Sequence, residues 1–376
     1  MTPMPIPSLI RRASLAPPAR RREEAPAFSV VFSVVRRSCV SAPPAQGREE
    51  ALPALDARIC SRIAPPARGE APPGRWTGFR IGPEGGGRAG VAAGGVIRAE
   101  AAGHLGEFLQ GLLGPGGPVA LVTLPAPVLR VAARLAPGPF GLHCAGPRAL
   151  DRGRAAALCR AVTGRPPFGR LVLRAGMPAG GGAGSSTAAL LAAARVWALA
   201  CGRALPAPER LARLCLEIEG ATDPLMHPEP ARLLWASRLG RILVVLPPPP
   251  ALEAVGGFLG AGKRTDPGDA DFADVSDLAA AWAPAAARGD AEALGRIATE
   301  SARRNQLRRG GPDLAPLLAA AARHGAVGIV AAHTGAARGL LFAPGRGEPD
   351  RAAETLRGLG LTGVRRFGLA GPPGAR

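Results

Sequence analysis

Residues 178–189 combine a glycine tract, adjacent hydroxyls and an alanine-rich run, Pro-Ala-Gly-Gly-Gly-Ala-Gly-Ser-Ser-Thr-Ala-Ala. Glycine lets the backbone turn sharply and expose its N–H groups, and a helix N-terminus attracts negative charge. The preceding residues 171–176 have strand composition, and Ser186 suits the N-cap of a helix over 187–200. The order of strand, glycine loop and helix therefore predicts a phosphate-binding site with a nucleotide as its ligand.

Two other phosphate-binding loops are excluded by residue type. A P-loop ends in Gly-Lys-Ser/Thr, whereas the only lysine of the chain is Lys263, far from this segment. A dinucleotide-binding fingerprint needs a third glycine where Ser185 or Thr187 stands. The remaining alternative to a phosphate site is a glycine-rich turn that is capped by serines and binds no ligand.

The pattern Pro-x-x-x-Gly-x-Gly-Ser-Ser resembles the GHMP kinases, the small-molecule kinases of galactose, homoserine, mevalonate and phosphomevalonate, with Ala183 where those enzymes usually have leucine. The resemblance extends from near Val91 to about Leu369. It implies that ATP binds to this loop. The implied ATP-binding residues are Pro178, Gly180, Gly181, Gly182, Ala183, Gly184, Ser185, Ser186 and Thr187.

Glu107 and Gln110 lie between two apolar stretches that are typical of strands, so we expect them near a strand-to-strand turn. Their segment resembles the first GHMP motif. Its form, Gly-x-x-Gly-Glu-x-x-Gln-Gly, is similar to the L-threonine kinase branch associated with cobalamin synthesis and propanediol utilisation. The resemblance implies substrate binding by Glu107 and Gln110. His104 stands near the place of the family's usual lysine, whose charge an arginine such as Arg174 could supply.

A third segment, residues 208–226, has an apolar stripe at helical spacing and a glycine, Gly220, that suits the C-cap. In GHMP kinases a glutamate at the end of such a helix helps to hold Mg²⁺, and an aspartate a few residues later faces the substrate hydroxyl. The resemblance therefore implies that Glu219 and Ser186 hold the metal and that Asp223 is the catalytic base. Glu217 is the alternative metal ligand.

Residues 326–342 read as a strand, a glycine turn and a strand. They resemble the third GHMP motif, which packs against the phosphate loop and borders the substrate. The turn holds His333, Thr334 and Gly335, and its His-Thr-Gly wording is again similar to the threonine kinase branch. The resemblance implies that these three residues contact substrate.

The chain as a whole limits the possible functions. Its 376 residues carry a net charge of +19, but 46 of the 47 basic residues are arginines spread along the chain, so we expect no specific nucleic-acid function. Residues 1–90 are rich in Pro and Arg, which predicts a disordered extension; a mitochondrial presequence is the alternative. The apolar run 28–35 is too short to span a membrane. Cysteines without metal-binding spacing indicate a reducing cytoplasm.

The expected fold is α+β, a GHMP kinase-like two-domain fold. Residues 91–247 would form the N-terminal mixed-sheet ATP-binding domain, and residues 248–376 a C-terminal ferredoxin-like α/β sandwich. Helices are predicted at 150–163, 187–200, 208–219, 275–288, 290–307, 313–324 and 349–358, and further strands at 241–246, 326–332, 338–343 and 364–368. We expect a loop at 256–268 to cover the substrate, where Lys263 or Arg264 could bind a carboxylate.

Together these features predict an ATP- and Mg²⁺-dependent kinase of a small hydroxylated metabolite, a monomer or homodimer with L-threonine as its substrate. Homoserine or another amino alcohol is the alternative substrate. A GHMP-fold protein that binds a nucleotide or metabolite without turnover is the alternative from a different class.

Overall fold

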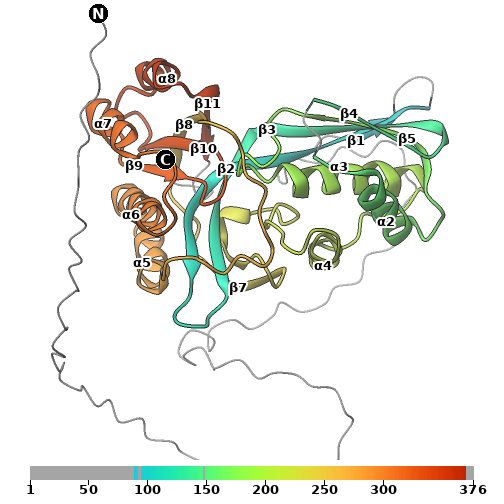
Figure 1. Ribbon diagram of the computed structural model, residues 1–376, viewed down its shortest axis with the longest axis horizontal. Coiled ribbons are helices and arrows are strands. Elements are labelled where there is room, and N and C mark those ends of the chain that lie inside the picture. Colours follow the sequence, from blue (N-terminus) through green and yellow to red (C-terminus); the bar gives the residue numbers. More distant parts are fainter. Residues whose placement is uncertain (1–88, 92–94, 147–148, 370–376) are drawn as a thin grey trace, which may run out of the picture. The chain divides into compact units, whose positions relative to one another are not determined.

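The computed structural model describes residues 89–91, 95–146 and 149–369, and a mixed sheet runs through this part of the chain (Figure 1). The strands are β1 (Ala89–Val91), β2 (Ile97–Leu112), β3 (Val119–Pro139), β4 (Gly141–Ala145), β5 (Phe168–Ala175), β6 (Leu233–Ala236), β7 (Arg241–Val245), β8 (Leu252–Phe258), β9 (Gly328–Ala331), β10 (Ala337–Phe342) and β11 (Thr362–Leu369). The helices are α2 (Arg152–Thr163), α3 (Ser185–Ala200), α4 (Pro208–Glu219), α5 (Ser276–Ala287), α6 (Ala291–Arg309), α7 (Ala315–Arg323) and α8 (Pro349–Gly358), with a 3₁₀ turn η1 (Pro230–Arg232).

The long hairpin of β2 and β3 is the centre of the sheet. The strand order is β11-β8-β10-β9-β2-β3-β5-β4. In addition, β1 pairs with β2, and β6 of the β6–β7 hairpin pairs with the start of β3, at Ala120 and Leu121. β4 and β5 are parallel, and the other strand pairs in the described residues are antiparallel. A single residue pair, Glu107 with Ala331, joins β2 to β9. Glu107 therefore lies where the strands of the two halves of the chain meet.

Two groups of helices cover the sheet (Figure 1). α3 packs on β2 and β3 and is flanked by α2 and α4. In the C-terminal half α6 packs on β9 and β2, α5 packs on α6, and α8 packs on β8 and β11. Alanine and leucine let α3 lie close to the sheet, and most of its residues are buried. Because this helix is enclosed, solvent screens the positive end of its dipole only weakly.

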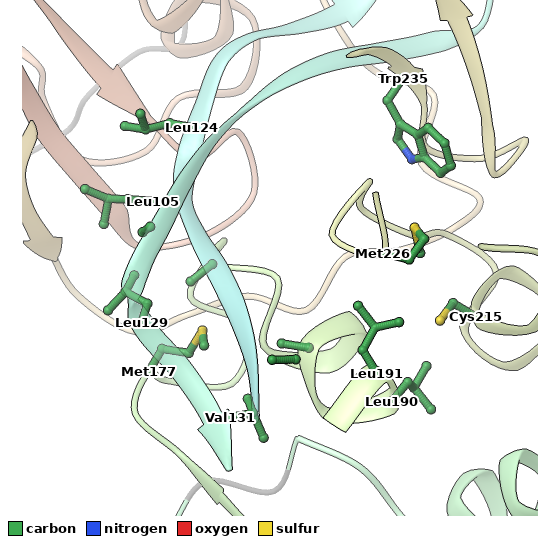
Figure 2. Close-up of a cluster of buried hydrophobic side chains, with 14 of the residues drawn as sticks. Leu105, Leu124, Leu129, Val131, Met177, Leu190, Leu191, Cys215, Met226 and Trp235 are labelled. Atoms are coloured by element: carbon green, nitrogen blue, oxygen red, sulfur yellow. The ribbon is translucent and has the colours of Figure 1, made fainter. Parts of the chain in front are cut away.

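The core around α3 fixes the elements that reach the glycine loop. Figure 2 shows Leu190 and Leu191 of α3 beside Cys215 of α4 and Met226, while Leu105, Leu124 and Met177 line the β2–β3 hairpin. These side chains are buried in one apolar cluster. A second cluster lies under α7 and α8 in the C-terminal half. Burial of this kind contributes about 25 cal/mol per Å² of apolar surface, and it holds the ends of β2, α3 and α4 at one place.

The structure differs from the predicted elements at three places. Glu107 and Gln110 lie within β2 itself, because this strand continues to Leu112 before the turn to β3; Gln110 is close to that turn, and Glu107 is further from it. Gly184, and not Ser186, is the N-cap of α3, which begins at Ser185. The loop expected at 256–268 starts later, since β8 continues to Phe258 and lies between β11 and β10.

The remaining predicted helices and strands are present, with ends within three residues of the predicted ones. The segment expected to be an N-terminal extension lies outside the described residues, except that its last two residues belong to β1. The predicted domain boundary falls between β7 and β8 and stays a prediction. In the part of the chain that the structure describes, every helix is too short or too polar to cross a membrane.

Candidate active site

The glycine loop, residues 178–184, connects β5 to α3. Gly180, Gly182 and Gly184 have φ values of +70°, +69° and +64°, which L side chains rarely adopt. In the described residues no backbone N–H from 182 to 187 donates to another protein group. The first N–H groups of a helix and a loop of alternating left-handed glycines both form concave anion sites. The sequence therefore folds locally into a cradle for a phosphate.

The carbonyl groups of the glycine loop point away from this cradle, toward the sheet. Gly181 accepts a hydrogen bond from the N–H of Ala337 at 2.8 Å, Gly182 from Gly106 at 3.1 Å and Ala183 from His104 at 3.1 Å. β2 and β10 thus hold the loop from two sides. These hydrogen bonds fix the orientation of the loop, so its N–H groups are already directed to the pocket before a ligand binds.

The turn between β9 and β10 packs its backbone directly on the glycine loop. A Cβ atom built on Gly335 would lie 2.2 Å from the nitrogen of Gly182, and one built on Gly182 would lie 2.2 Å from the Cβ of Ala332. Such distances leave no room for a side chain at either position. Gly335 therefore sets the approach of His333 and Thr334 to the loop.

We expect Gly335→Ala to destabilise the fold by about 1–3 kcal/mol, as overpacking typically does, and to weaken binding of a non-hydrolysable ATP analogue. Thermal unfolding and calorimetry measure the two effects. Gly358→Ala is the control, because a Cβ at Gly358 meets nothing within 4 Å. Unchanged stability and nucleotide affinity in Gly335→Ala would show that the two loops do not need this close approach.

Ser186 and Glu219 place two oxygen ligands at the mouth of the cradle. Ser186 is in the first turn of α3 and donates a hydrogen bond to Glu219. Glu219 is the last residue of α4, which ends because Gly220 adopts a left-handed conformation and its N–H caps the carbonyl of Leu216. Glu217 is exposed and does not line the pocket. Burial first, and then the charge of Asp223, raise the pKa of Glu219 to about 8.

This oxygen pair fits Mg²⁺, which proteins commonly hold with one or two carboxylates while substrate phosphates and water complete the coordination. The protein alone does not supply a complete metal site: among the described residues no group of three or more His, Cys, Asp or Glu side chains could hold a metal ion. A site of this kind needs the phosphates of a bound nucleotide to become complete. Arg154 and Arg264 also line the pocket, and their charges oppose the rise in the pKa of Glu219.

Asp223 lies beside the N-terminus of α3 and forms an ion pair with a buried histidine. Its carboxylate is 3.4 Å from the hydroxyl of Thr187 and 3.4 Å from Nε2 of His104. Burial alone lowers the pKa of His104, but the charges of Asp223 and Glu107 outweigh it and raise the pKa to about 9. The same pairing outweighs the effect of burial on Asp223 and lowers its pKa. At neutral pH Asp223 is therefore an anion paired with a cationic imidazole.

This pairing makes the stability of the fold depend on pH. Since the pKa of His104 is raised from 6.5 to about 9 in the folded protein, its contribution of about 3 kcal/mol is complete below pH 6.5 and is lost as the pH rises through 9. We expect the midpoint of thermal unfolding to fall across this range. In His104→Gln the fall should become smaller, and the remaining part should come from Glu219, whose pKa is also raised, to about 8. The fall should persist in full in His143→Gln, which changes an exposed histidine of β4. An unchanged pH profile in His104→Gln would contradict the assignment.

Glu107 and Gln110 line the pocket from β2, and His333 lines it from the β9–β10 turn. Oε2 of Glu107 is 3.9 Å from Nδ1 of His333, and both atoms are buried without a hydrogen-bond partner in the described residues. Nε2 of His333 lies 3.4 Å from Oγ of Ser301 on α6, which in turn accepts the N–H of Gln110 at 3.1 Å. Oε2 of Glu107 and Nδ1 of His333 face each other but are too far apart for a hydrogen bond, so a ligand group that enters the pocket could satisfy either of them.

One pocket collects nearly all of the predicted site residues. It is lined by Glu107, Gln110, Gly180, Gly182, Ala183, Gly184, Ser185, Ser186, Thr187, Glu219, Asp223, His333 and Thr334. Pro178, Gly181 and Gly335 do not line it; Gly181 packs against the rings of Pro178 and Phe258, and Gly335 packs behind Gly182. Arg174 does not line it either, because it lies exposed on β5. The positions of these residues agree with the predicted site, while their roles stay predictions.

Several pocket residues were not predicted from the sequence. They are Arg154, Thr222, Ser237, Arg238, Thr265 and Pro267. Ser237 and Arg238 begin the turn between β6 and β7, a hairpin whose first strand was not predicted. No motif marks this turn, and only the pairing of β6 with β3 brings it to the pocket. Lys263 and Arg264, which were proposed as carboxylate ligands, line the pocket.

Comparisons with known proteins agree with this geometry. Family models for the GHMP kinases N terminal domain and the GHMP kinases C terminal domain match residues 152–226 and 282–360. The first match spans the glycine loop, Glu219 and Asp223, and the second spans His333 and Thr334. A comparison of the sequence with curated proteins finds no match.

Solved kinase structures share the fold. Mevalonate kinase of L. major, in complex with R-mevalonate, matches with a TM-score of 0.51 and 13% identity over 72% of this chain and 96% of that chain. Phosphomevalonate kinase of Streptococcus pneumoniae, in complex with phosphomevalonate and AMPPNP, matches with a TM-score of 0.50 and 13% identity over 72% and 99%. Mevalonate kinase of Methanococcus jannaschii matches with a TM-score of 0.50 and 11% identity over 74% of this chain and 98% of that chain.

These matches confirm the predicted α+β two-domain fold. The two family domains occur in the order predicted from the sequence, and each contains residues that line the same pocket. The chain therefore contains the N- and C-terminal domains of the GHMP kinases, over residues 152–226 and 282–360, and is a phosphotransferase of small molecules.

Proposed function

We propose that this protein is an ATP- and Mg²⁺-dependent kinase that phosphorylates the hydroxyl of a small amino acid, with L-threonine as the substrate and O-phospho-L-threonine as the product. One observation carries the proposal. A single pocket contains the free N–H groups of the glycine loop, the Ser186–Glu219 oxygen pair and the Asp223–His104 ion pair. These are the parts that phosphoryl transfer to an alcohol requires.

The parts have separate roles in the proposed reaction. The N–H groups of residues 182–187 and the dipole of α3 bind the β- and γ-phosphates of ATP. Ser186 and Glu219 would hold Mg²⁺, which neutralises phosphate charge when bound. The substrate oxygen forms a bond to the γ-phosphorus, the bond from that phosphorus to the β,γ-bridging oxygen breaks, and ADP leaves. Asp223 accepts the hydroxyl proton, and His104 keeps it ionised and oriented.

His104 also supplies the charge that a lysine would supply in this position. Its imidazolium is buried beside the N-terminus of α3, 3.4 Å from Asp223. A buried cation in a low-dielectric site acts strongly on nearby charges. With Arg154, Lys263 and Arg264 around the same pocket, the γ-phosphate meets positive charge from several directions.

The choice of threonine is supported by the amino-acid sequences of the motifs. Gly-Glu-x-x-Gln-Gly at 106–111, Thr187 after the serine pair and His-Thr-Gly at 333–335 are similar to the L-threonine kinase branch, which is associated with cobalamin synthesis and propanediol utilisation. Homoserine is the second candidate, because the Glu-Gly…Asp spacing at Glu219–Asp223 is similar to homoserine kinases. A binding protein without turnover is the alternative from another class.

ADP release with a panel of alcohols tests the proposal. The panel contains L-threonine, L-homoserine, L-serine, mevalonate and 1-amino-2-propanol, each with ATP and Mg²⁺. We expect the highest kcat/KM with L-threonine and detection of O-phospho-L-threonine by mass spectrometry. A higher kcat/KM with homoserine would show that homoserine, and not threonine, is the substrate. ATP binding without ADP release for any alcohol would overturn the kinase proposal in favour of the binding protein.

The setting and domain organisation are also proposals. The cysteines of the described residues, Cys144, Cys159, Cys201 and Cys215, are free thiols, which is compatible with the ATP-rich and reducing cytoplasm that we propose. We propose the division into domains at 91–247 and 248–376, because the second begins at β8, the strand that pairs with β10 and β11.

A further inference from the structure

The pocket has two walls of different charge on either side of β3. Gln110 of β2 pairs with Leu121 of β3, which pairs in turn with Trp235 of β6, so these three residues lie in one row across the sheet. Adjacent strands are about 4.8 Å apart, so β2 and β6 are separated by about 10 Å. Glu107 lies on the β2 side of this row, and Arg238 follows β6 on the other side.

Arg238 faces the pocket with part of its hydrogen-bonding capacity unused. Its guanidinium donates to the carbonyls of Pro267 and Asp266, at 3.1 and 3.2 Å, and to the hydroxyl of Ser237 at 3.2 Å. A guanidinium has five N–H donors in a fixed fork, so donors remain for a further acceptor. No carboxylate of the described residues lies within 4.0 Å of it.

The neutral partners of Arg238 fix its position but leave its charge without direct neutralisation. The two carbonyls belong to the loop that follows β8, and the hydroxyl belongs to its own turn, so the side chain is held rigidly at the pocket wall. Arg238 is near enough to Asp223 for its charge to help lower the pKa of that carboxyl. A planar, oriented guanidinium of this kind matches a carboxylate.

The opposite wall is complementary in charge. Glu107 is 6% exposed, and its Oε2 atom has no hydrogen-bond partner in the described residues. The Nδ1 atoms of His104 and His333 lie 3.7 and 3.9 Å from the two carboxylate oxygens, too far for a hydrogen bond, so a ligand ammonium would supply the donor that Oε2 lacks. Leu121 lies between the two walls and lines the pocket floor. The floor is thus apolar where the carbon skeleton of a small substrate would lie.

We propose that Arg238 binds the carboxylate of the substrate while Glu107 binds its ammonium group, so that the pocket selects a zwitterionic amino acid among alcohols. The inference rests on the proposed kinase function and adds Arg238 as a residue that determines specificity. Asp223 lines the same pocket, so a substrate held at both charged ends would present its hydroxyl to that carboxylate.

The test compares L-threonine with two analogues that each lack one charge. L-threoninamide replaces the carboxylate by an amide, and 3-hydroxybutyrate lacks the ammonium group. We measure kcat and KM of the full chain with each compound for wild type, Arg238→Gln, Arg238→Lys and Glu107→Gln. Arg241→Gln is the control, because Arg241 is an exposed arginine in the same hairpin and does not line the pocket.

A hydrogen bond between charged groups contributes about 1.5–3 kcal/mol, so the wild type should use threoninamide about 10- to 100-fold less efficiently than threonine. Arg238→Gln should lose this preference by raising the KM for threonine, with the KM for ATP unchanged. Arg238→Lys should keep part of it. Glu107→Gln should still prefer threonine to threoninamide, but it should lose the preference for threonine over 3-hydroxybutyrate.

Three results separate the possible failures. If Arg238→Gln lowers kcat/KM for threonine and threoninamide by the same factor, Arg238 only holds the loop and the inference is overturned. If the wild type phosphorylates uncharged alcohols as well as it phosphorylates threonine, the inference fails while the kinase function stands. If the wild type phosphorylates no alcohol but binds ATP, the proposed function itself fails.

Discussion

Replacing Asp223 with asparagine should lower kcat by about 10²- to 10⁴-fold, the usual contribution of a positioned general base, and should leave the KM for ATP close to its wild-type value. Asparagine keeps the size of the side chain and can still accept a hydrogen bond from Thr187, which is 3.4 Å away. It removes the negative charge that pairs with His104 and that would accept the hydroxyl proton. Single-turnover measurements with threonine and ATP report this step directly.

The control for this prediction is Asp313→Asn, which changes an exposed aspartate outside the pocket. Thermal unfolding at pH 7 shows whether Asp223→Asn is folded, because the loss of the ion pair leaves a buried His104 without its main partner. A folded Asp223→Asn variant that retains wild-type kcat would contradict the role of Asp223 as base. The γ-phosphate would then react with a hydroxyl that needs no proton acceptor from the protein.

Helix ends could be predicted from the sequence because their signals are local. Gly164 and Gly220 adopt the left-handed C-cap conformation at the ends of α2 and α4, and Asp290 caps the first turn of α6. β8 could not be predicted in this way. A Cβ on Gly256 would lie 2.4 Å from the carbonyl oxygen of Arg338, and one on Gly257 would lie 2.5 Å from that of Thr362. These glycines serve close strand packing and look like loop residues in the sequence alone.

The same distinction applies to the site. Ser186 and Asp223 stand in motifs whose spacing specifies their surroundings, so they could be identified before the fold was seen. Arg238 reaches the pocket only because β6 pairs with β3, and no local pattern reports that pairing. The pairing of His104 with Asp223, which are 119 positions apart in the sequence, likewise follows from how β2 passes the end of α3. The missed features are those that depend on contacts distant in sequence.

Glu219→Gln should raise the Mg²⁺ concentration needed for half-maximal activity by more than the 10- to 100-fold that is typical of residues that only support a metal ligand. Glutamine keeps the length of the side chain and can still accept the hydrogen bond from Ser186, but it cannot ionise to the carboxylate that binds a hard cation. Turnover measured against Mg²⁺ concentration gives the shift. Calorimetry with Mg²⁺ and a non-hydrolysable ATP analogue measures the same loss without catalysis.

Glu217→Gln is the matched control, since Glu217 is two residues earlier on α4, exposed and outside the pocket. Both variants replace a glutamate of α4 with glutamine, and they differ only in the face of the helix on which the replaced residue lies. A shift in the Mg²⁺ requirement for Glu219→Gln alone would assign the metal to the cradle at α3. An equal shift in both variants, or a shift in Glu217→Gln alone, would contradict this assignment, because Glu217 has no path to Ser186 in this helix register.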